Sequence, residues 1–311
     1  MTAVDGVRRP GSQAPASIGR RVTGGKVPTR PWTVYERRDG VLAPRSDLLA
    51  VEEPLEIRLG QTGEGAASTL SVTMRTPGHD FELVAGFLLG EGAISGVGDV
   101  KKIAYCLDGT LEPEQRYNVV TAELTVPPRR AGLERHVVTS SACGICGSAS
   151  IDAVRLAGHP DLGAGPHIDV GFLAGLPLLL AGGQRGFAET GGLHGAALVA
   201  ADGAVLALRE DVGRHNAVDK VIGWALLNRR LPLVDVVLIV SGRVSFEIVQ
   251  KALRAGVPVV AAVSAATSLA ARLADEVGMT LVGFVRGERC TVYAGRQRIS
   301  FDPITGAGSP G

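Results

Sequence analysis

Alternating apolar and polar residues dominate the chain from about residue 30 to residue 126. A period of two residues predicts strands with one buried face. The segments that alternate, or that carry short apolar runs, are 32–36, 41–42, 49–51, 54–59, 70–75, 100–107 and 117–126. Phe81–Gly90 instead has a helical period, and Asp80 is placed to cap that helix. The pattern predicts a small α+β domain.

Beyond residue 148, helical periods alternate with continuous apolar runs. Helices are expected at 148–157, 170–181, 214–227, 246–255 and 268–277. Buried strands are expected at 234–240, 257–263 and 280–285. Residues 187–194 are expected to form a strand or turn that leads into a hairpin of Gly195–Ala200 and Ala204–Arg209 around Asp202-Gly203. Apolar strands separated by helices favour parallel pairing in a layered α/β domain.

These patterns divide the chain into two domains and two tails. We expect a disordered tail over 1–30, which is rich in Gly, Pro, Ser, Thr and Arg. A small N-terminal α+β domain over 31–130 and an α/β domain over 131–303 follow, and 304–311 form a flexible tail. The link near 127–138 is polar and basic, so the segment after it lies at a domain junction, where binding sites are common.

Composition excludes several classes of protein. With 45% hydrophobic and 20% charged residues, the 311-residue chain is globular. Its net charge of +1 gives no general attraction for nucleic acid, so any anion site must be local. The apolar runs are too short to span a bilayer, and no apolar segment follows the arginine pairs at 8–9 and 20–21 as an export signal requires. Four unevenly spaced cysteines suit a reducing compartment. We therefore expect a cytoplasmic protein that binds neither membrane nor nucleic acid.

Cys143 and Cys146 form a C-x-x-C pair among small Ser, Ala and Gly residues. These neighbours leave the thiols accessible, and the helix expected at 148–157 would place Cys146 near its N-terminus, where the dipole favours a thiolate. The spacing alone also fits buried cysteines, half of a zinc site or a thioredoxin-like redox pair. Cys106 and Cys290 are each single, so a zinc site would have to be assembled from distant parts of the chain.

Polar residues follow each of the three buried strands. Ser241 and Arg243 lie after the first strand, Ser264 after the second and Arg286–Arg289 after the third. Hydroxyls and arginines at helix starts are suited to bind anions. Helix capping explains any one of these segments, but three together favour a ligand that carries phosphates. The chain has no Walker A sequence and no G-x-G-x-x-G, which disfavours simple ATP hydrolysis and NAD chemistry.

Arg209–Asn216 places six ionisable or amide side chains within eight residues, between a strand and a helix. Such a loop is either a solvated connection or a site, and we favour a site. His215 is the best candidate for a general acid or base because its intrinsic pKa lies near neutrality. Arg214 is suited to hold an anion. The glycine-rich run Glu189–His194 offers a second histidine, His194.

Five segments, in order along the chain, carry a family resemblance. They are Thr76–Gly92, the SSACGICG run that holds the cysteine pair, Thr190–Leu198, Arg209–Lys220 and Ser241–Ala252. Together they resemble the FdhD/NarQ family, the formate dehydrogenase accessory sulfurtransferases. Any one segment is modest evidence, but five in order are very specific, and the resemblance extends over about residues 30 to 301.

The resemblance implies a carrier of sulfane sulfur. Members of the family accept sulfur from a cysteine desulfurase as a persulfide, and pass it to the molybdenum or tungsten bis(guanine dinucleotide) cofactor before that cofactor enters formate dehydrogenase. It implies that the persulfide forms on Cys143 with the help of Cys146. The family's cofactor-binding segment matches Phe284, Val285, Arg286, Gly287, Glu288 and Arg289. A cytidine deaminase-like fold for the larger domain and a homodimer are also implied.

We expect the cofactor to be bound as a substrate, with no intrinsic metal. The further candidates for binding it are Ser241, Arg243, Ser264, His194, Arg214 and His215. Two other functions stay open. A zinc hydrolase of the deaminase type requires H-x-E and P-C-x-x-C, and the chain contains neither. A non-catalytic chaperone that only binds and delivers the cofactor requires no persulfide.

Overall fold

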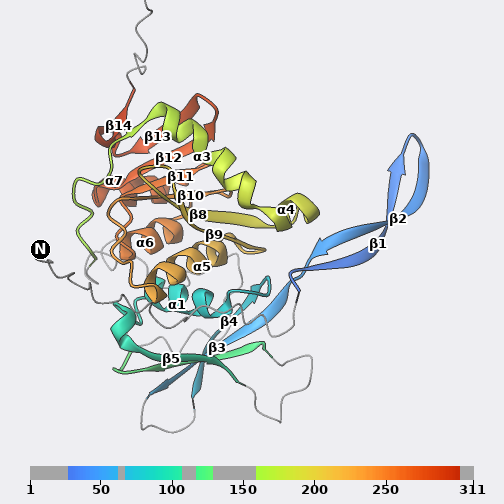
Figure 1. Ribbon diagram of the computed structural model, residues 1–311, viewed down its shortest axis with the longest axis horizontal. Helices are drawn as coiled ribbons and strands as arrows, with labels where there is room; N and C mark the ends of the chain where they lie inside the picture. Colours follow the sequence, from blue (N-terminus) through green and yellow to red (C-terminus); the bar gives the residue numbers. More distant parts are fainter. Residues whose placement is uncertain (1–26, 62–66, 107–116, 129–158, 302–311) are drawn as a thin grey trace, which may run out of the picture.

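The computed structural model describes residues 27–61, 67–106, 117–128 and 159–301 (Figure 1). Cys143, Cys146 and the helix expected at 148–157 lie outside these residues, as do most of the two expected tails. The described part contains two large sheets with helices between and outside them, and a two-stranded arm (Figure 1). None of the helices in these ranges is long and apolar enough to cross a membrane.

The larger sheet has six strands in the order β13-β12-β11-β10-β8-β9. They are β8 (His194–Ala200), β9 (Val205–Asp211), β10 (Val236–Val240), β11 (Val259–Ala262), β12 (Thr280–Arg286) and β13 (Arg289–Ala294). The parallel pairing expected for the three apolar strands is confirmed, since β10, β11 and β12 are parallel. The other pairs are antiparallel, so the sheet is mixed.

Helices cover both faces of this sheet. On one face lies α3 (Val170–Gly183); on the other lie α5 (Arg214–Leu227), α6 (Phe246–Arg254) and α7 (Ser268–Glu276). Alternate side chains of each central strand enter the two cores: Val237 and Ile239 face α3, while Leu238 faces α5 to α7. This explains the continuous apolar runs in the sequence. Short elements complete the layer: α4 (Arg185–Thr190), η3 (Arg296–Arg298) and the paired β7 (Ile168–Asp169) and β14 (Ile299–Ser300).

The smaller sheet has four strands in the order β4-β3-β6-β5. They are β3 (Glu53–Gln61), β4 (Ser68–Arg75), β5 (Val100–Tyr105, after η1, Val97–Asp99) and β6 (Val119–Leu124). Helix α1 (Asp80–Gly90) packs between this sheet and α5. A Cβ at Gly86 would overlap the carbonyl of Asp219, and one at Gly223 would overlap the carbonyl of Glu82. Two glycines therefore let α1 and α5 meet backbone to backbone, and one hydrophobic core joins the two sheets.

Two local predictions were wrong. Asp80 does not cap α1: His79 is the N-cap residue, and Asp80 is the first residue of the helix. The Asp80 carboxylate instead accepts two hydrogen bonds from the buried Arg75, each of 3.0 Å. Residues 187–190 belong to α4 and are neither strand nor turn. Helix α4 is stabilised by a residue distant in sequence, because the Glu210 carboxylate accepts hydrogen bonds from backbone N–H groups of its first turn.

The arm consists of β1 (Thr29–Arg38) and β2 (Val41–Ala50), which pair in antiparallel register. The three short strands expected here are thus two strands of ten residues each. Asp39 and Gly40 connect them with φ angles of 52° and 83°, as a two-residue hairpin turn requires. The arm projects away from the rest of the molecule (Figure 1).

Candidate functional site

The loops that follow β10, β11 and β12 lie side by side. Val244 donates its N–H to the carbonyl of Ala265 over 3.0 Å and accepts one from Thr267 over 3.0 Å. Phe284 donates its N–H to the carbonyl of Ser264 over 3.0 Å. The three polar segments predicted after the apolar strands therefore meet at one edge of the sheet, the usual location of ligand sites in such folds. We call this region the strand-end edge.

Two predicted site residues meet beside Gly242 at this edge. His194 is the first residue of β8, and Arg214 is the first residue of α5. A Cβ on Gly242 would lie 3.3 Å from Nδ1 of His194 and 3.4 Å from Cβ of Arg214. Glycine at position 242 thus leaves room for both side chains. Segments that are far apart in sequence converge on one small region.

The electrostatics of this region favour a neutral histidine beside a permanent cation. Burial lowers the pKa of His194, and the positive charge of Arg214 lowers it further, while Asp211 acts in the opposite direction. The Nε atom of Arg214 is buried, and it has no hydrogen-bond partner in the described part of the chain. An acceptor supplied by a ligand would satisfy this donor.

His215 is held by groups at the start of α6. Its Nε2 lies 3.0 Å from Oγ of Ser245 and 3.1 Å from Oε2 of Glu247. Ser245 also donates to Glu247 over 2.7 Å. The hydrogen bond from His215 is the main reason that the pKa of Glu247 falls to about 2. Both partners use the same ring nitrogen, so the cluster differs from a hydrolase triad, in which serine and carboxylate occupy opposite nitrogens.

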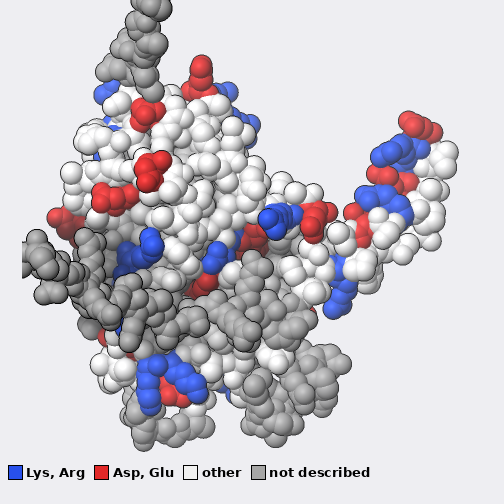
Figure 2. All heavy atoms as spheres, in the orientation of Figure 1, with Lys and Arg blue, Asp and Glu red and all other residues white. Residues whose placement is uncertain are grey.

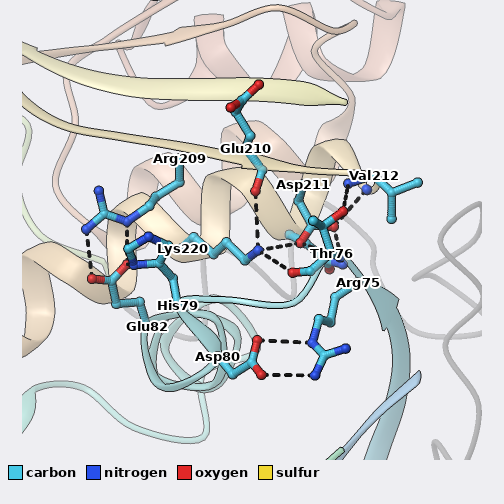
Figure 3. A network of polar contacts seen from close by, with 12 residues as sticks. Arg75, Thr76, His79, Asp80, Glu82, Arg209, Glu210, Asp211, Val212 and Lys220 are labelled. Carbon is cyan, nitrogen blue, oxygen red and sulfur yellow. Dashed lines mark hydrogen bonds and ion pairs between the residues drawn. The ribbon is translucent and has the colours of Figure 1, made fainter. Parts of the chain in front are cut away.

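A buried ion pair fixes the chain just before Arg214. Asp211 and Lys220, 0% and 1% exposed, lie 2.7 Å apart (Figure 3). Lys220 also donates to the carbonyls of Thr76 and Glu210 over 2.9 and 3.2 Å. Asp211 accepts the N–H of Thr76 over 3.2 Å. The start of α5 is thereby attached to the segment that follows β4, and this contact between distant motifs was not predicted from the sequence.

Several charges of the loop that runs from Arg209 to Asn216 have structural partners. Arg209 forms two hydrogen bonds of 2.6 and 2.8 Å with Glu82 of α1 (Figure 3). Glu210 binds the first turn of α4. The sequence predicts one site for the whole charged loop. In the structure Arg209 and Glu210 form structural contacts, and only Arg214 and His215 lie at the strand-end edge.

The segment matched to the family's cofactor site comprises the last three residues of β12, the turn residues Gly287 and Glu288, and the first residue of β13. Val285 is fully buried, whereas Phe284 and the four residues after Val285 are exposed. Phe284 has a φ of 51°, an uncommon value for a bulky residue, at a register irregularity between β12 and β13. This end of the β12–β13 hairpin therefore presents an aromatic ring and the charges of Arg286, Glu288 and Arg289 to solvent.

The remaining predicted residues differ in their freedom to bind a ligand. The Ser241 hydroxyl accepts the N–H of Gly195 over 3.0 Å, which joins β10 to β8. Arg243 is exposed and Ser264 is half-buried at the end of β11. In the described ranges, no group of three or more His, Cys, Asp or Glu side chains is arranged to hold a metal ion.

The fold is similar to that of a solved protein structure. The solved structure of a candidate formate dehydrogenase accessory protein from Desulfotalea psychrophila superimposes with a TM-score of 0.67. The match covers 88% of this chain and 99% of that chain at 24% sequence identity. The mixed α/β fold class is confirmed, and the likeness of the larger domain to cytidine deaminases stays a prediction.

Sequence comparison identifies the family. The protein-family model described as FdhD/NarQ family matches residues 50–300 of this chain. The sulfur carrier protein FdhD of Streptomyces coelicolor is 50% identical over 280 residues, which cover 88% of this chain and 97% of that protein. The sulfur carrier protein FdhD of Nocardia farcinica is 52% identical over 257 residues, or 82% and 89% of the two chains. This chain belongs to the FdhD/NarQ family, and the resemblance read from its five motifs is confirmed.

Proposed function

We propose that this protein is a sulfurtransferase that carries sulfane sulfur for the maturation of formate dehydrogenase. The observation that supports the proposal most directly is that the family match, residues 50–300, contains the one C-x-x-C pair of the sequence. Relatives about half identical to this chain are named sulfur carrier protein.

The first chemical step is the transfer of sulfur to Cys143. Its thiolate attacks the terminal sulfur of a persulfide on a cysteine desulfurase, so a new S–S bond forms on Cys143 as the donor's S–S bond breaks. The donor cysteine leaves as a thiolate. Cys146 then assists release: its thiolate attacks the inner sulfur of the Cys143 persulfide, which forms a disulfide between the two cysteines and frees the outer sulfur as hydrosulfide.

The acceptor is the bis(guanine dinucleotide) form of the molybdenum or tungsten cofactor, bound as a substrate at the strand-end edge. Its pyrophosphates fit the exposed guanidinium groups of Arg243, Arg286 and Arg289. The unpartnered Nε of Arg214 fits a further acceptor atom. The exposed ring of Phe284 offers a stacking surface for a guanine base. His194, Ser241, Ser264 and His215 line or brace the same edge.

The partners in this proposal are a cysteine desulfurase and a formate dehydrogenase, and the setting is the cytoplasm. The protein acts as a homodimer. The competing function is a chaperone that binds and delivers the cofactor without carrying sulfur. The binding residues at the strand-end edge serve either function equally well, so the cysteine pair decides between them.

The deciding experiment is intact-protein mass spectrometry of the full chain after incubation with a cysteine desulfurase and cysteine, without reductant. We expect the wild type to gain sulfur, which dithiothreitol removes. Cys143→Ser abolishes the gain, whereas Cys290→Ser, a half-buried cysteine on β13, retains it as the matched control. If neither the wild type nor Cys146→Ser, which cannot discharge the persulfide as hydrosulfide, gains sulfur from an active desulfurase, the chaperone function replaces the proposed one.

A further inference from the structure

The first turn of α5 lacks the side chains that normally stabilise the start of a helix. Its first two residues are Arg214 and His215, its first turn contains no acidic residue, and Gly213 at the N-cap offers no side chain to cap it. The N-terminus of a helix carries a partial positive charge, which acidic and capping side chains stabilise and basic side chains do not. A bound anion would compensate for both deficits. This arrangement supports the phosphate site proposed above, on which the present inference rests.

The attraction of an anion to this helix start is local. The whole chain has a net charge of only +1. On the face shown in Figure 2, basic and acidic side chains of the described residues are scattered, and neither sign dominates. Arginine is always charged, whereas histidine is charged only when it is protonated. The protonation state of His215 therefore decides whether one or two positive side chains stand at the start of α5.

The contacts of His215 determine which ring nitrogen always carries a hydrogen. Its Nε2 lies 3.0 Å from Oγ of Ser245 and 3.1 Å from Oε2 of Glu247. Ser245 donates its hydroxyl proton to Glu247 over 2.7 Å, so its oxygen can only accept a hydrogen bond from the imidazole. The carboxylate of Glu247 can likewise only accept. Nε2 is therefore a donor in both protonation states, and Nδ1 is the nitrogen that gains or loses a proton.

A buried ion pair one helical turn further along holds α5 and α6 together. Lys251 of α6 donates to both carboxylate oxygens of Asp219 of α5, over 2.7 and 2.8 Å, and the two residues are 6% and 2% exposed. Asp219 lies four residues after His215, and Lys251 lies four residues after Glu247. Residues four apart share a face of a helix, so the two pairs are successive contacts between the same two helices. Helix packing therefore keeps Glu247 against His215.

Charged and titratable groups from several elements surround this pair of contacts. They are Arg214 and Asp219 of α5, Glu247 and Lys251 of α6, His194 of β8, Asp211 of β9 and Glu91 after α1. Most of them are already balanced, because Lys251 pairs with Asp219 and Lys220 pairs with Asp211. The carboxylate in direct contact with the ring of His215 is that of Glu247. A carboxylate at this distance favours the protonated form of a histidine.

We propose that Glu247 is a positioning residue that keeps His215 charged beside Arg214, so that the strand-end edge binds a diphosphate ester tightly only while His215 is protonated. Glu247 and Ser245 accept the hydrogen on Nε2, which leaves the hydrogen on Nδ1 for a phosphate oxygen. Loss of that proton removes one positive charge and one donor from the start of α5. Binding is therefore weaker at higher pH. The inference adds control by protonation to the proposed phosphate site.

The test is the affinity of the full chain for guanosine diphosphate mannose, measured by calorimetry between about pH 5.5 and about pH 8.5. A terminal phosphate titrates at about pH 6 and would obscure the titration of the protein. Both phosphates of this probe are diesters, so its charge is constant over the interval. We expect the affinity of the wild type to fall about tenfold as the pH rises, because a charge-assisted hydrogen bond is lost.

Two variants separate control of charge from support of the fold, with circular dichroism as a check on folding. Glu247→Gln should bind the probe nearly as tightly as the wild type at about pH 5.5, where histidine is protonated without help. Its affinity should then fall at a lower pH than that of the wild type, because the carboxylate is gone. His215→Gln should bind weakly at every pH. A residue that only supports the fold would instead lower the affinity equally at every pH.

His79 provides a matched control. Its Nδ1 lies 3.1 Å from Oε2 of Glu82, so it forms a second histidine–glutamate pair, at the start of α1. His79→Gln should keep both the affinity and the pH dependence of the wild type. A loss of the pH dependence in this variant would show that the titrating group is not His215, and would overturn the inference.

The remaining outcomes separate this inference from the proposed function. It is overturned by a wild-type affinity independent of pH, by a pH dependence that persists in His215→Gln, or by a Glu247→Gln profile that matches the wild type or is lowered equally at every pH. Each of these results leaves the phosphate site in place. Absence of binding at any pH overturns the site and the inference together. Persulfide formation, measured by mass spectrometry, tests the sulfur-carrier function independently of all of them.

Discussion

The buried pair of Asp211 and Lys220 gives the most quantitative prediction. Lys220→Met keeps the length of the side chain and removes its charge. Asp211 then lies at 0% exposure without its counter-charge, and the carbonyls of Thr76 and Glu210 each lose a donor. Breaking a buried ion pair on one side typically costs about 3–5 kcal/mol of folding free energy. We expect a loss in that range, and a fall in Tm of about 10 °C.

Urea unfolding measures the loss of folding free energy in Lys220→Met directly. A double variant at Asp211 and Lys220 shows whether the unpaired charge of Asp211 causes that loss. Asp211→Asn with Lys220→Met removes both charges, so the double variant should be more stable than the sum of the two single losses predicts, by about 1–3 kcal/mol. Lys101→Met is the control, because Lys101 is half exposed and forms a 3.6 Å surface pair with Glu123, worth at most about 1 kcal/mol. If Lys220→Met costs less than about 1 kcal/mol with an unchanged urea dependence, the buried pair does not fasten the start of α5.

Three further results are expected. Gly86→Ala should prevent stable folding, because the added methyl group overlaps the backbone of α5. Gly175→Ala, whose methyl group meets nothing within 4 Å, should leave Tm unchanged or higher. Equal Tm values for the two variants would contradict the backbone contact between α1 and α5. The lowered pKa of Glu247, about 2 against 4.5, means that its contribution to stability is complete above about pH 4.5 and disappears as the pH falls towards 2. In Glu247→Gln, the urea midpoint should therefore change less with pH over that interval than it does in the wild type. The same pH dependence in both proteins would refute this. Arg214→Lys keeps the charge but removes Nε, so the affinity for guanosine diphosphate, measured by calorimetry, should fall about tenfold; unchanged affinity would place the phosphates elsewhere.

The sequence predicts the layered part of this fold because its signals are local. The apolar runs that became β10, β11 and β12 lie between two cores, so every residue of β10 and β11 and most residues of β12 are buried. The edge strand β13 was not predicted, since most of its residues are half-buried and it follows a charged turn directly. Helix α4 was missed because the carboxylate that caps it, that of Glu210, comes from another element.

The candidate site shows the same division between local and distant causes. Hydroxyls and arginines after parallel strands predict a shared edge, and the loops do lie side by side there. The partners of individual charges were not predictable, because they depend on tertiary contacts. His215 looks like a free acid or base in the sequence, yet it lies 3.1 Å from Glu247, 32 residues further on. The cysteine pair is read from the sequence alone, since it lies outside the described residues.

The contact between α1 and α5 has a mechanical consequence. Where two helices meet through glycines, no flexible side chain lies between them to absorb a displacement. A force on the four-stranded sheet therefore passes through α1 into α5, and α5 begins with Arg214 at the strand-end edge. The two sheets are therefore coupled through a contact with little slack, and a displacement of the smaller sheet is transmitted to the start of α5, where Arg214 lies.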